Sequence, residues 1–239
     1  MKALRIVLLV LALGVAVAIV ASGFGARFNV WDFRVGFMML AYGAYTGYAV
    51  AAVALVLLLI PATRRGHAGV LGVALAVALG AAAVPTVWRY QARDLPPIND
   101  ITTDFDNPPQ YIAIVPLRAS DPVSAAYGGE ATAKAQRASY PDIAPVMLKA
   151  SPVQAFAKAL AIAREMGWTI VASDEQTGRI EAVATTTWFG FHDDVVIRVS
   201  PAPDGSRVDI RSHSRVGRGD IGANARRVRD FTSRLARAG

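Results

Sequence analysis

The sequence predicts a membrane-anchored α+β protein, with three transmembrane α-helices followed by one extramembrane domain. Long apolar runs fill residues 1–94, and the chain of 239 residues is 54% hydrophobic. From residue 151 onward the apolar residues recur first with a helical period, then with the alternation of strands, then with a helical period again. We therefore expect a transmembrane region, 1–94, and an extramembrane domain, 95–239, of order α-β-β-β-β-α, whose antiparallel sheet carries both helices on one face.

The first predicted helix, about residues 4–22, follows the basic residues Lys2 and Arg5. A basic start before a short apolar run is also typical of a cleavable signal peptide. We favour an uncleaved helix because two more apolar runs follow it, and cleavage is the alternative.

The second and third predicted helices cover about residues 35–60 and 68–88. The second contains no charged residue, and about 20 apolar residues are enough to cross the hydrocarbon core of a bilayer. Its Gly43 and Gly47 have the spacing that lets another helix approach closely, although glycine is also simply common in such helices. The third ends in an aromatic and basic cluster that begins at Trp88, which is typical of a helix leaving the membrane at the headgroups.

Three spans place the C-terminal domain on the opposite side of the membrane from the N-terminus. Lysine and arginine are enriched in cytoplasmic loops, but here four such residues flank the helices on each side. The α-amino group and the Arg64-Arg65 pair in a very short loop favour a cytoplasmic N-terminus. We therefore expect a multi-pass protein of the bacterial inner membrane with its C-terminal domain in the periplasm.

Positive charge is concentrated around the apolar region. Residues 1–94 carry 8 Lys and Arg against 2 Asp and Glu, whereas residues 95–239 carry 17 against 16. Because a nucleic-acid-binding domain needs a concentrated basic footprint of its own, the nearly neutral domain argues against nucleic acid as a partner. The chain has no cysteine, which excludes disulfides, thiol nucleophiles and thiolate metal sites.

The domain begins with a polar linker, a strand candidate at 111–116 and an irregular stretch up to Pro145. Ser151 followed by Pro152 marks a helix start, and Gly167 ends that helix. Asp220 is expected to cap the last helix. The four predicted strands between the two helices are 168–173, 179–187, 193–200 and 207–214.

Turn residues set the expected strand register. Centring the last hairpin on Asp204-Gly205 gives three informative pairs. They are Val199 with Ile210, Arg198 with Arg211, and Asp194 with Arg215. Centring the preceding hairpin on Phe189-Gly190 places Glu181 opposite Arg198. One face of the sheet is therefore expected to be apolar and the other to carry rows of charged side chains.

The charged rows support two interpretations. Opposite charges on neighbouring strands are common on exposed sheet faces and contribute about 0.2–1 kcal/mol each, so a solvated salt ladder is the simpler one. The other is that Arg198 and Arg211, if opposed, would repel unless an anion or a carboxylate such as Asp209 lay between them. The candidate residues for binding a ligand or partner are Asp193, Asp194, Arg198, Arg211, His213, Arg215 and Asp220.

No catalytic constellation, metal site or cofactor site is predicted. Adjacent strand residues point to opposite faces, so Asp193 and Asp194 cannot share one ion. The stretch 217–222 matches G-x-G-x-x-G, but only 17 residues follow it and Asp220 would place a negative charge at a pyrophosphate. A tight turn and helix cap is the better interpretation. Three acidic residues of the linker are also expected to form turns and caps. They are Asp100, Asp104 and Asp106.

Six blocks of the C-terminal part carry a family resemblance. They are INDITTD (98–104), YPDI (140–143), GW (167–168), RIEA (179–182), FHDDVVIR (191–198) and RSHSRVGRGDIGAN (211–224). In this order they resemble DUF1499, a bacterial family of proteins of unknown function, over about residues 95–236. The resemblance implies that the domain is the working part and the leader helices an attachment, and it implies no activity.

We therefore expect a non-enzymatic binding or envelope-associated module. It would contact the lipid bilayer and bind an envelope protein or an anionic lipid through its basic C-terminal helix and polar sheet face. The alternative is an enzyme or anionic-ligand binder that uses the polar sheet face.

Overall fold

The computed structural model describes residues 2–119 and 121–238, and the chain forms two compact units. One unit comprises Met1–Arg93 with Thr187–Gly190, and the other comprises Asp94–Thr186 with Phe191–Gly239.

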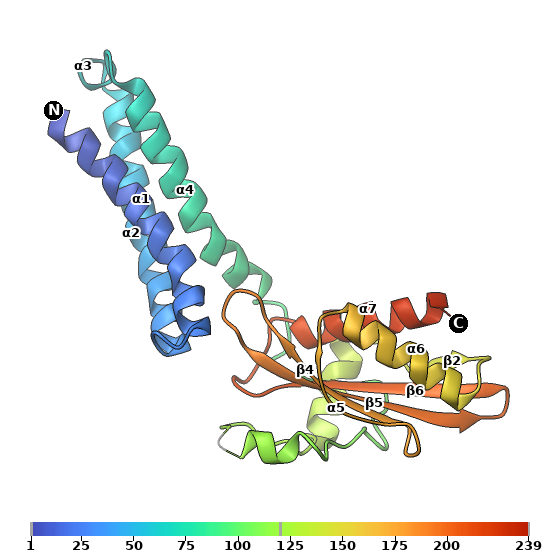
Figure 1. Ribbon diagram of the computed structural model, residues 1–239. Coiled ribbons are helices and arrows are strands. Elements are labelled where there is room, and N and C mark those ends of the chain that lie inside the picture. The colour runs from blue at the N-terminus through green and yellow to red at the C-terminus, as the bar shows by residue number, and fades with distance from the viewer. Residues whose placement is uncertain (1, 120, 239) are drawn as a thin grey trace. The chain divides into compact units, whose positions relative to one another are not determined.

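Three long helices build the first unit (Figure 1). They are α1 (Lys2–Arg27), α2 (Phe33–Leu59) and α4 (Ala68–Gln91), with the single-turn helix α3 (Pro61–Arg64) between the last two. All three are long and apolar enough to cross a membrane, as the sequence predicts. Helix α4 continues through Pro85 and ends three residues beyond its predicted end.

Small residues bring these three helices together. A Cβ atom on Gly47 would lie 3.0 Å from the carbonyl oxygen of Ala78 in α4. A Cβ atom on Gly43 would lie 2.9 Å from Cγ1 of Ile19 in α1. Both glycines of α2 therefore permit close helix packing, which favours the packing interpretation of their spacing over chance.

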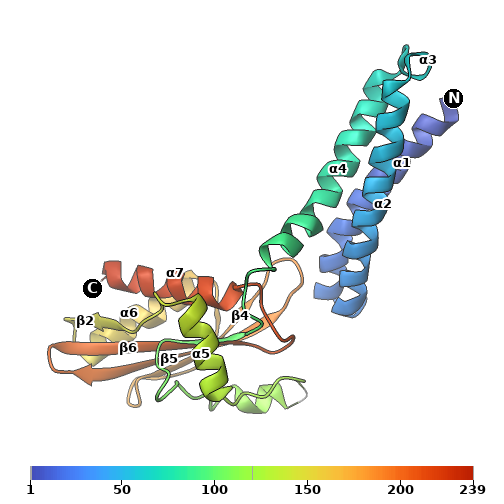
Figure 2. The same ribbon diagram turned by 180° about the vertical axis from the view of Figure 1, so that it is seen from behind.

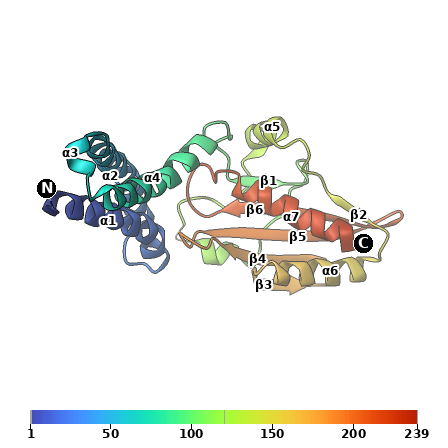
Figure 3. The same cartoon turned by 90° about the horizontal axis from the view of Figure 1, so that it is seen from above.

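The second unit is built on a six-stranded antiparallel sheet. Its order is β1-β6-β5-β4-β3, and β2 pairs with β6 on the same edge as β1 (Figure 3). The strands are β1 (Asp100–Thr102), β2 (Val146–Leu148), β3 (Thr169–Asp174), β4 (Arg179–Thr185), β5 (His192–Ala202) and β6 (Gly205–Ser214). The helices are η1 (Val115–Arg118), α5 (Gly129–Ser139), α6 (Pro152–Glu165) and α7 (Ala223–Ala238).

The predicted order α-β-β-β-β-α is confirmed from α6 to α7, while the region before α6 differs from the prediction. Residues 111–116 do not form a strand, and η1 covers 115–118 instead. Strand β1 arises in the predicted polar linker and helix α5 in the stretch expected to be irregular, while β2 follows Pro145, where no element was predicted. Each of the two strands has three residues, too few to show a period of two, and both form because β6 offers them a partner edge.

Both hairpins are shifted by two residues from the predicted register. The observed pairs include Ala202 with Gly205, Arg198 with Asp209, Asp194 with His213, Val199 with Val208, and Glu181 with Val196. The predicted opposition of Arg198 and Arg211 is therefore wrong. A shift of two residues keeps every side chain on its predicted face, so the division into an apolar and a charged face is unaffected.

The main apolar core lies between the sheet and helices α6 and α7 (Figure 1). Ile197 and Ile210 of the sheet and Phe231 of α7 are fully buried in it. The ring of Trp168 stacks on Phe231 with a centroid distance of 5.6 Å. Ser151 starts α6 with the predicted cap, completed by a reciprocal hydrogen bond from its backbone to the Gln154 side chain.

Candidate functional site

The charged face of the sheet is covered by residues 103–119 and 121–128, which we call the strap (Figure 2). One carboxylate anchors it. Glu181 of β4 is fully buried, and its two oxygens accept the backbone N–H groups of Ile112, Ala113 and Ile114 at 2.9–3.1 Å. The Nε atom of Arg179 lies 3.2 Å from the same carboxylate. The carboxylate thus satisfies three successive backbone donors of a chain segment that has no sheet partner there.

Arg211 of β6 lies at the centre of the covered face. Its side chain is fully buried and donates two parallel hydrogen bonds of 2.7 and 2.8 Å to Asp100 of β1. It also donates to the carbonyl oxygen of Ala125 at 2.9 Å. The rings of Tyr111 and Tyr127 lie 4.9 and 5.3 Å from its guanidinium carbon. A fork-shaped cation is therefore matched by a bidentate carboxylate and two aromatic faces.

A second buried group surrounds Asp194 of β5. Arg215 donates to this carboxylate at 2.8 Å, and Nη1 of Arg118 from the strap lies 3.2 Å from it. Asp121 of the strap lies 3.7 Å from Arg215. Arg118 also donates to the carbonyl oxygen of Ser214 in β6 at 3.3 Å, so it joins the strap to the sheet at two points.

A third group lies toward the turn of the β5–β6 hairpin. Arg198 donates to Asp104 at 2.7 Å and to Asp209 at 3.0 Å, and Arg207 pairs with the same two carboxylates. Asp104 also accepts the backbone N–H groups of two following residues, which confirms its predicted turn role. The same expectation was wrong for Asp100, which pairs with Arg211 from within β1.

Two of the candidate residues face α7 instead. Asp193 accepts a 2.6 Å hydrogen bond from Arg227 of that helix. Asp220 accepts the backbone N–H groups of Gly222 and Asn224 at 2.8 and 2.6 Å, which confirms its predicted cap. Asp193 and Asp194 therefore lie on opposite faces of the sheet, as the strand alternation predicts.

The strap-side charges balance one another. Six arginines contact six carboxylates there, and no extra anion is needed to separate Arg198 from Arg211. The arginines are Arg118, Arg179, Arg198, Arg207, Arg211 and Arg215, and the carboxylates are Asp100, Asp104, Asp121, Glu181, Asp194 and Asp209. The charged face is therefore an internally paired layer rather than an exposed salt ladder. It is buried at Arg118 and Arg211 and partly exposed at its other four arginines.

His213 of β6 lies within this layer and is neutral at pH 7. Burial, aided by the nearby cations Arg118 and Arg211, lowers the pKa of its imidazole to about 3. Its Nδ1 atom lies 3.4 Å from Nη1 of Arg118, a geometry in which the neutral ring can accept a hydrogen bond. Burial is thus the main reason why this imidazole does not hold a proton at pH 7.

Metal binding finds no support in the part of the chain that the structure describes. Within residues 2–119 and 121–238, no group of three or more His, Asp or Glu side chains is arranged to hold a metal ion.

An open pocket adjoins the paired layer. It has a volume of about 390 Å³ and lies within the strap, beside Tyr111, Arg118 and Asp121. Three buried polar atoms of the strap, Nε of Arg118, Oδ2 of Asp121 and the hydroxyl of Tyr127, have no hydrogen-bond partner among the described residues. Burial raises the pKa of the Tyr127 hydroxyl to about 12, so it stays protonated and can donate.

Sequence reasoning missed the members of this layer that the strap and β1 supply. Arg118, Asp121 and Asp100 lie in stretches with no helical or strand period, so no pattern assigned them a face. One sign was available in the sequence: the charged face of the sheet carries more arginines than carboxylates. If that face is buried, the remaining arginines must find carboxylates elsewhere in the chain.

Comparison with protein families supports the resemblance seen in the sequence. A family model described as "Protein of unknown function (DUF1499)" matches residues 100–235, which is more than half of the chain. No curated protein matches the chain. The matched region begins at β1 and ends within α7, so it covers the sheet, the strap and the helices of the second unit. The chain therefore belongs to the DUF1499 family and carries three candidate transmembrane helices ahead of the family domain.

Proposed function

We propose that the protein is a membrane-anchored, non-enzymatic binding module of the cell envelope, and that the outer face of α7 binds an acidic protein partner. The observation that carries this proposal is the division of the arginines into two sets. Those on the sheet face are buried or partly buried and paired with carboxylates, which makes them less available to a partner. Those on the outer face of α7 are accessible.

The accessible set gives α7 a basic surface. Arg226 donates to the carbonyl oxygen of Ile221 and Arg237 to the hydroxyl of Ser233, so neither is paired with a carboxylate among the described residues. Arg234 pairs with Asp230 one turn away, with both side chains more than 40% exposed. Exposed pairs of this kind contribute little to stability, so these arginines are free to exchange partners at a binding surface.

The envelope location rests on the helices and their charges. Three spans would place the domain opposite the N-terminus, and the Arg64-Arg65 pair in the α2–α4 connection favours a cytoplasmic position for that end. The domain would then lie in the periplasm of a bacterial cell.

A site-specific photocrosslinker at Ser233, on the outer face of α7, tests the partner surface in intact cells. We expect a protein adduct that decreases about fivefold when Arg226→Gln and Arg237→Gln are combined, since two charges that steer a partner are lost. The matched control is Lys134→Gln with Lys149→Gln, two exposed cations elsewhere on the domain, which should change the adduct by less than about twofold. An equal decrease in the control, or adducts with lipid alone, would contradict the proposal.

A C-terminal reporter tests the sidedness separately. A fusion to alkaline phosphatase should be enzymatically active. A fusion to a fluorescent protein that fluoresces only in the cytoplasm should show no fluorescence. Fluorescence without phosphatase activity would place the domain in the cytoplasm.

The alternative function, an enzyme or anionic-ligand binder, is favoured by one observation, the pocket in the strap together with three unpartnered polar atoms of the strap. In that case Tyr127→Phe, which removes one unpartnered donor, would weaken a ligand-dependent rise in thermal stability. A screen of small anions against the full-length protein distinguishes the two functions, because the binding module predicts no stabilisation by any of them.

A further inference from the structure

The helical unit contains a buried arginine with an unpartnered nitrogen. Arg5 of α1 is 8% exposed, and its Nη1 atom is buried with no hydrogen-bond partner among the described residues. No carboxylate of this unit can serve it: Asp32 is the one acidic residue in 1–93, and it follows the opposite end of α1, where it pairs with Arg34. An unmatched guanidinium donor is costly to bury, so an acceptor from outside the chain is expected at this position.

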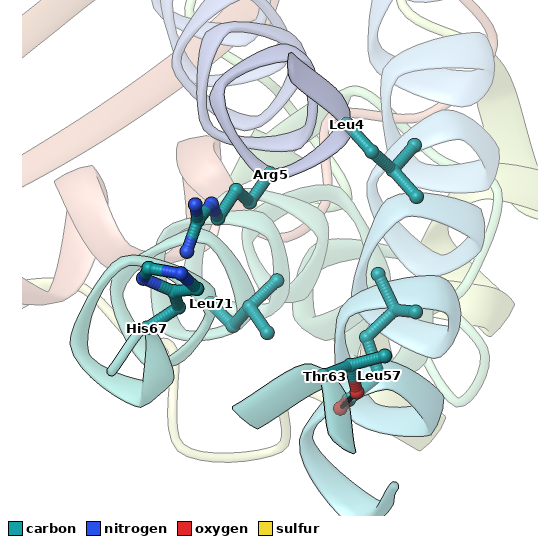
Figure 4. Close-up of a pocket in the computed structure, with 6 residues that line it drawn as sticks. All are labelled: Leu4, Arg5, Leu57, Thr63, His67 and Leu71. Carbon is teal, nitrogen blue, oxygen red and sulfur yellow. Dashed lines mark hydrogen bonds between the residues drawn. The ribbon is translucent and has the colours of Figure 1, made fainter. Parts of the chain in front are cut away.

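A second feature favours an anion at the same place. Figure 4 shows the Arg5 guanidinium directed at His67, which precedes the first residue of α4. No side chain caps this 24-residue helix. Its first backbone N–H groups therefore have no acceptor within the helix, and the positive end of the helix dipole adds to the charge of Arg5.

The space available defines how a ligand would enter. Arg5, His67 and Leu71 line an open pocket of about 10 Å³, together with Leu4, Leu57 and Thr63. This volume suits one water-sized group. A single oxygen atom fits between Arg5 and the start of α4, while the rest of the ligand stays outside the helices.

We propose that this pocket binds one phosphate oxygen of an anionic phospholipid headgroup. The ends of membrane-spanning helices lie at the level of the headgroups, where lipid phosphates are abundant. A net negative lipid is favoured over a zwitterionic one, because the exposed Arg65 follows in the α2–α4 connection and would repel a cationic headgroup. The site is independent of the proposed role of α7.

Lipid titration of the full-length protein in detergent tests this site, with native mass spectrometry to count bound phosphatidylglycerol. We expect wild-type protein to bind phosphatidylglycerol at least about tenfold more tightly than phosphatidylcholine. Arg5→Gln should weaken phosphatidylglycerol binding by about tenfold or more. The matched control is Arg65→Gln, which removes an exposed charge at the same end of the unit and should weaken binding by less than about threefold.

Three outcomes would overturn the proposal. Equal losses in Arg5→Gln and Arg65→Gln would mean that diffuse charge attracts the lipid. Equal affinity for the two lipids would mean that Arg5 contacts only interfacial water and no lipid phosphate. Millimolar inorganic phosphate that displaces the lipid completely would assign the site to free phosphate. If Arg5→Gln does not fold, Arg5→Lys keeps the charge but loses the fork of donors, and unchanged lipid preference in that variant would equally contradict the site.

Discussion

The two faces of the sheet are both buried, yet different forces hold their covers in place. Helices α6 and α7 pack on one face through apolar side chains such as Ile197 and Phe231. The strap covers the other face through buried arginines and carboxylates such as Arg211 and Asp100. The first contact is non-directional and grows with buried area, whereas the second depends on each charge keeping its own partner.

Burial alone therefore does not predict how much stability a face loses on substitution. An apolar face loses stability in proportion to the atoms removed. A paired face loses little when both partners are replaced together, but a great deal when one is left behind. Four measurements on the full-length protein in detergent test whether the two faces respond differently.

The largest expected effect is that of Arg211→Met. It leaves the Asp100 carboxylate buried without its bidentate partner, so the free energy of unfolding should fall by about 3–5 kcal/mol. Adding Asp100→Leu should recover more than half of the loss, as measured by urea unfolding. If the double variant is no more stable than the single one, Arg211 contributes through shape rather than charge, and the two faces are alike.

The next effect is a pH dependence that belongs to the strap side. The pKa of His213 is lowered to about 3 in the folded protein from about 6.5 when unfolded, so between these values protons bind the unfolded chain. Stability is then lost as the pH falls: about 1.4 kcal/mol per pH unit well below pH 6.5, or about 2 kcal/mol from pH 6.5 to 4.5. His213→Asn should remove this loss while keeping an acceptor for Arg118.

Some buried carboxyl groups titrate in the opposite sense, in the wild-type protein and in His213→Asn alike. Burial raises the pKa values of Asp100 and Asp194, against the opposing effect of their arginine partners. The difference between the wild-type and His213→Asn curves therefore isolates the histidine. Parallel curves over this range would show that the imidazole is already accessible to protons in the folded state.

A local effect is expected for Glu181→Gln. Its amide keeps one acceptor for the three backbone N–H groups of the strap but loses the negative charge, which should destabilise the strap by about 2 kcal/mol. Hydrogen exchange should quicken in residues 110–118 more than in α6. Glu175→Gln, an exposed carboxylate in the turn between β3 and β4, is the control and should leave exchange unchanged. Uniform acceleration would show that the strap does not open separately from the sheet.

The smallest effect tests the apolar face. Ile197→Val removes one buried methylene group and should lower the free energy of unfolding by about 0.5–1.5 kcal/mol. Because the lost contacts lie in the shared core, exchange should quicken only through global unfolding. Selective opening of the strap in this variant would mean that the two covers are coupled through β5.

The sequence alone determined the features that depend on near neighbours in the chain. The three apolar helices, the Ser151 and Asp220 caps and the apolar and charged faces of the sheet follow from periodicity and capping chemistry that act over a few residues. The predicted hairpin register was wrong by two residues. Turn residues locate a turn less precisely than the alternation of a strand assigns its side chains to one face or the other.

Tertiary structure alone decided what the charged face does. Arg211 finds Asp100 across 111 residues of chain, and Arg118 finds Asp194 from a segment with no regular period. Any arginine can pair with any carboxylate, so the sequence does not show which carboxylate a given arginine will contact. The fold chooses the partners because burying these side chains is tolerable only when each charge is matched in place.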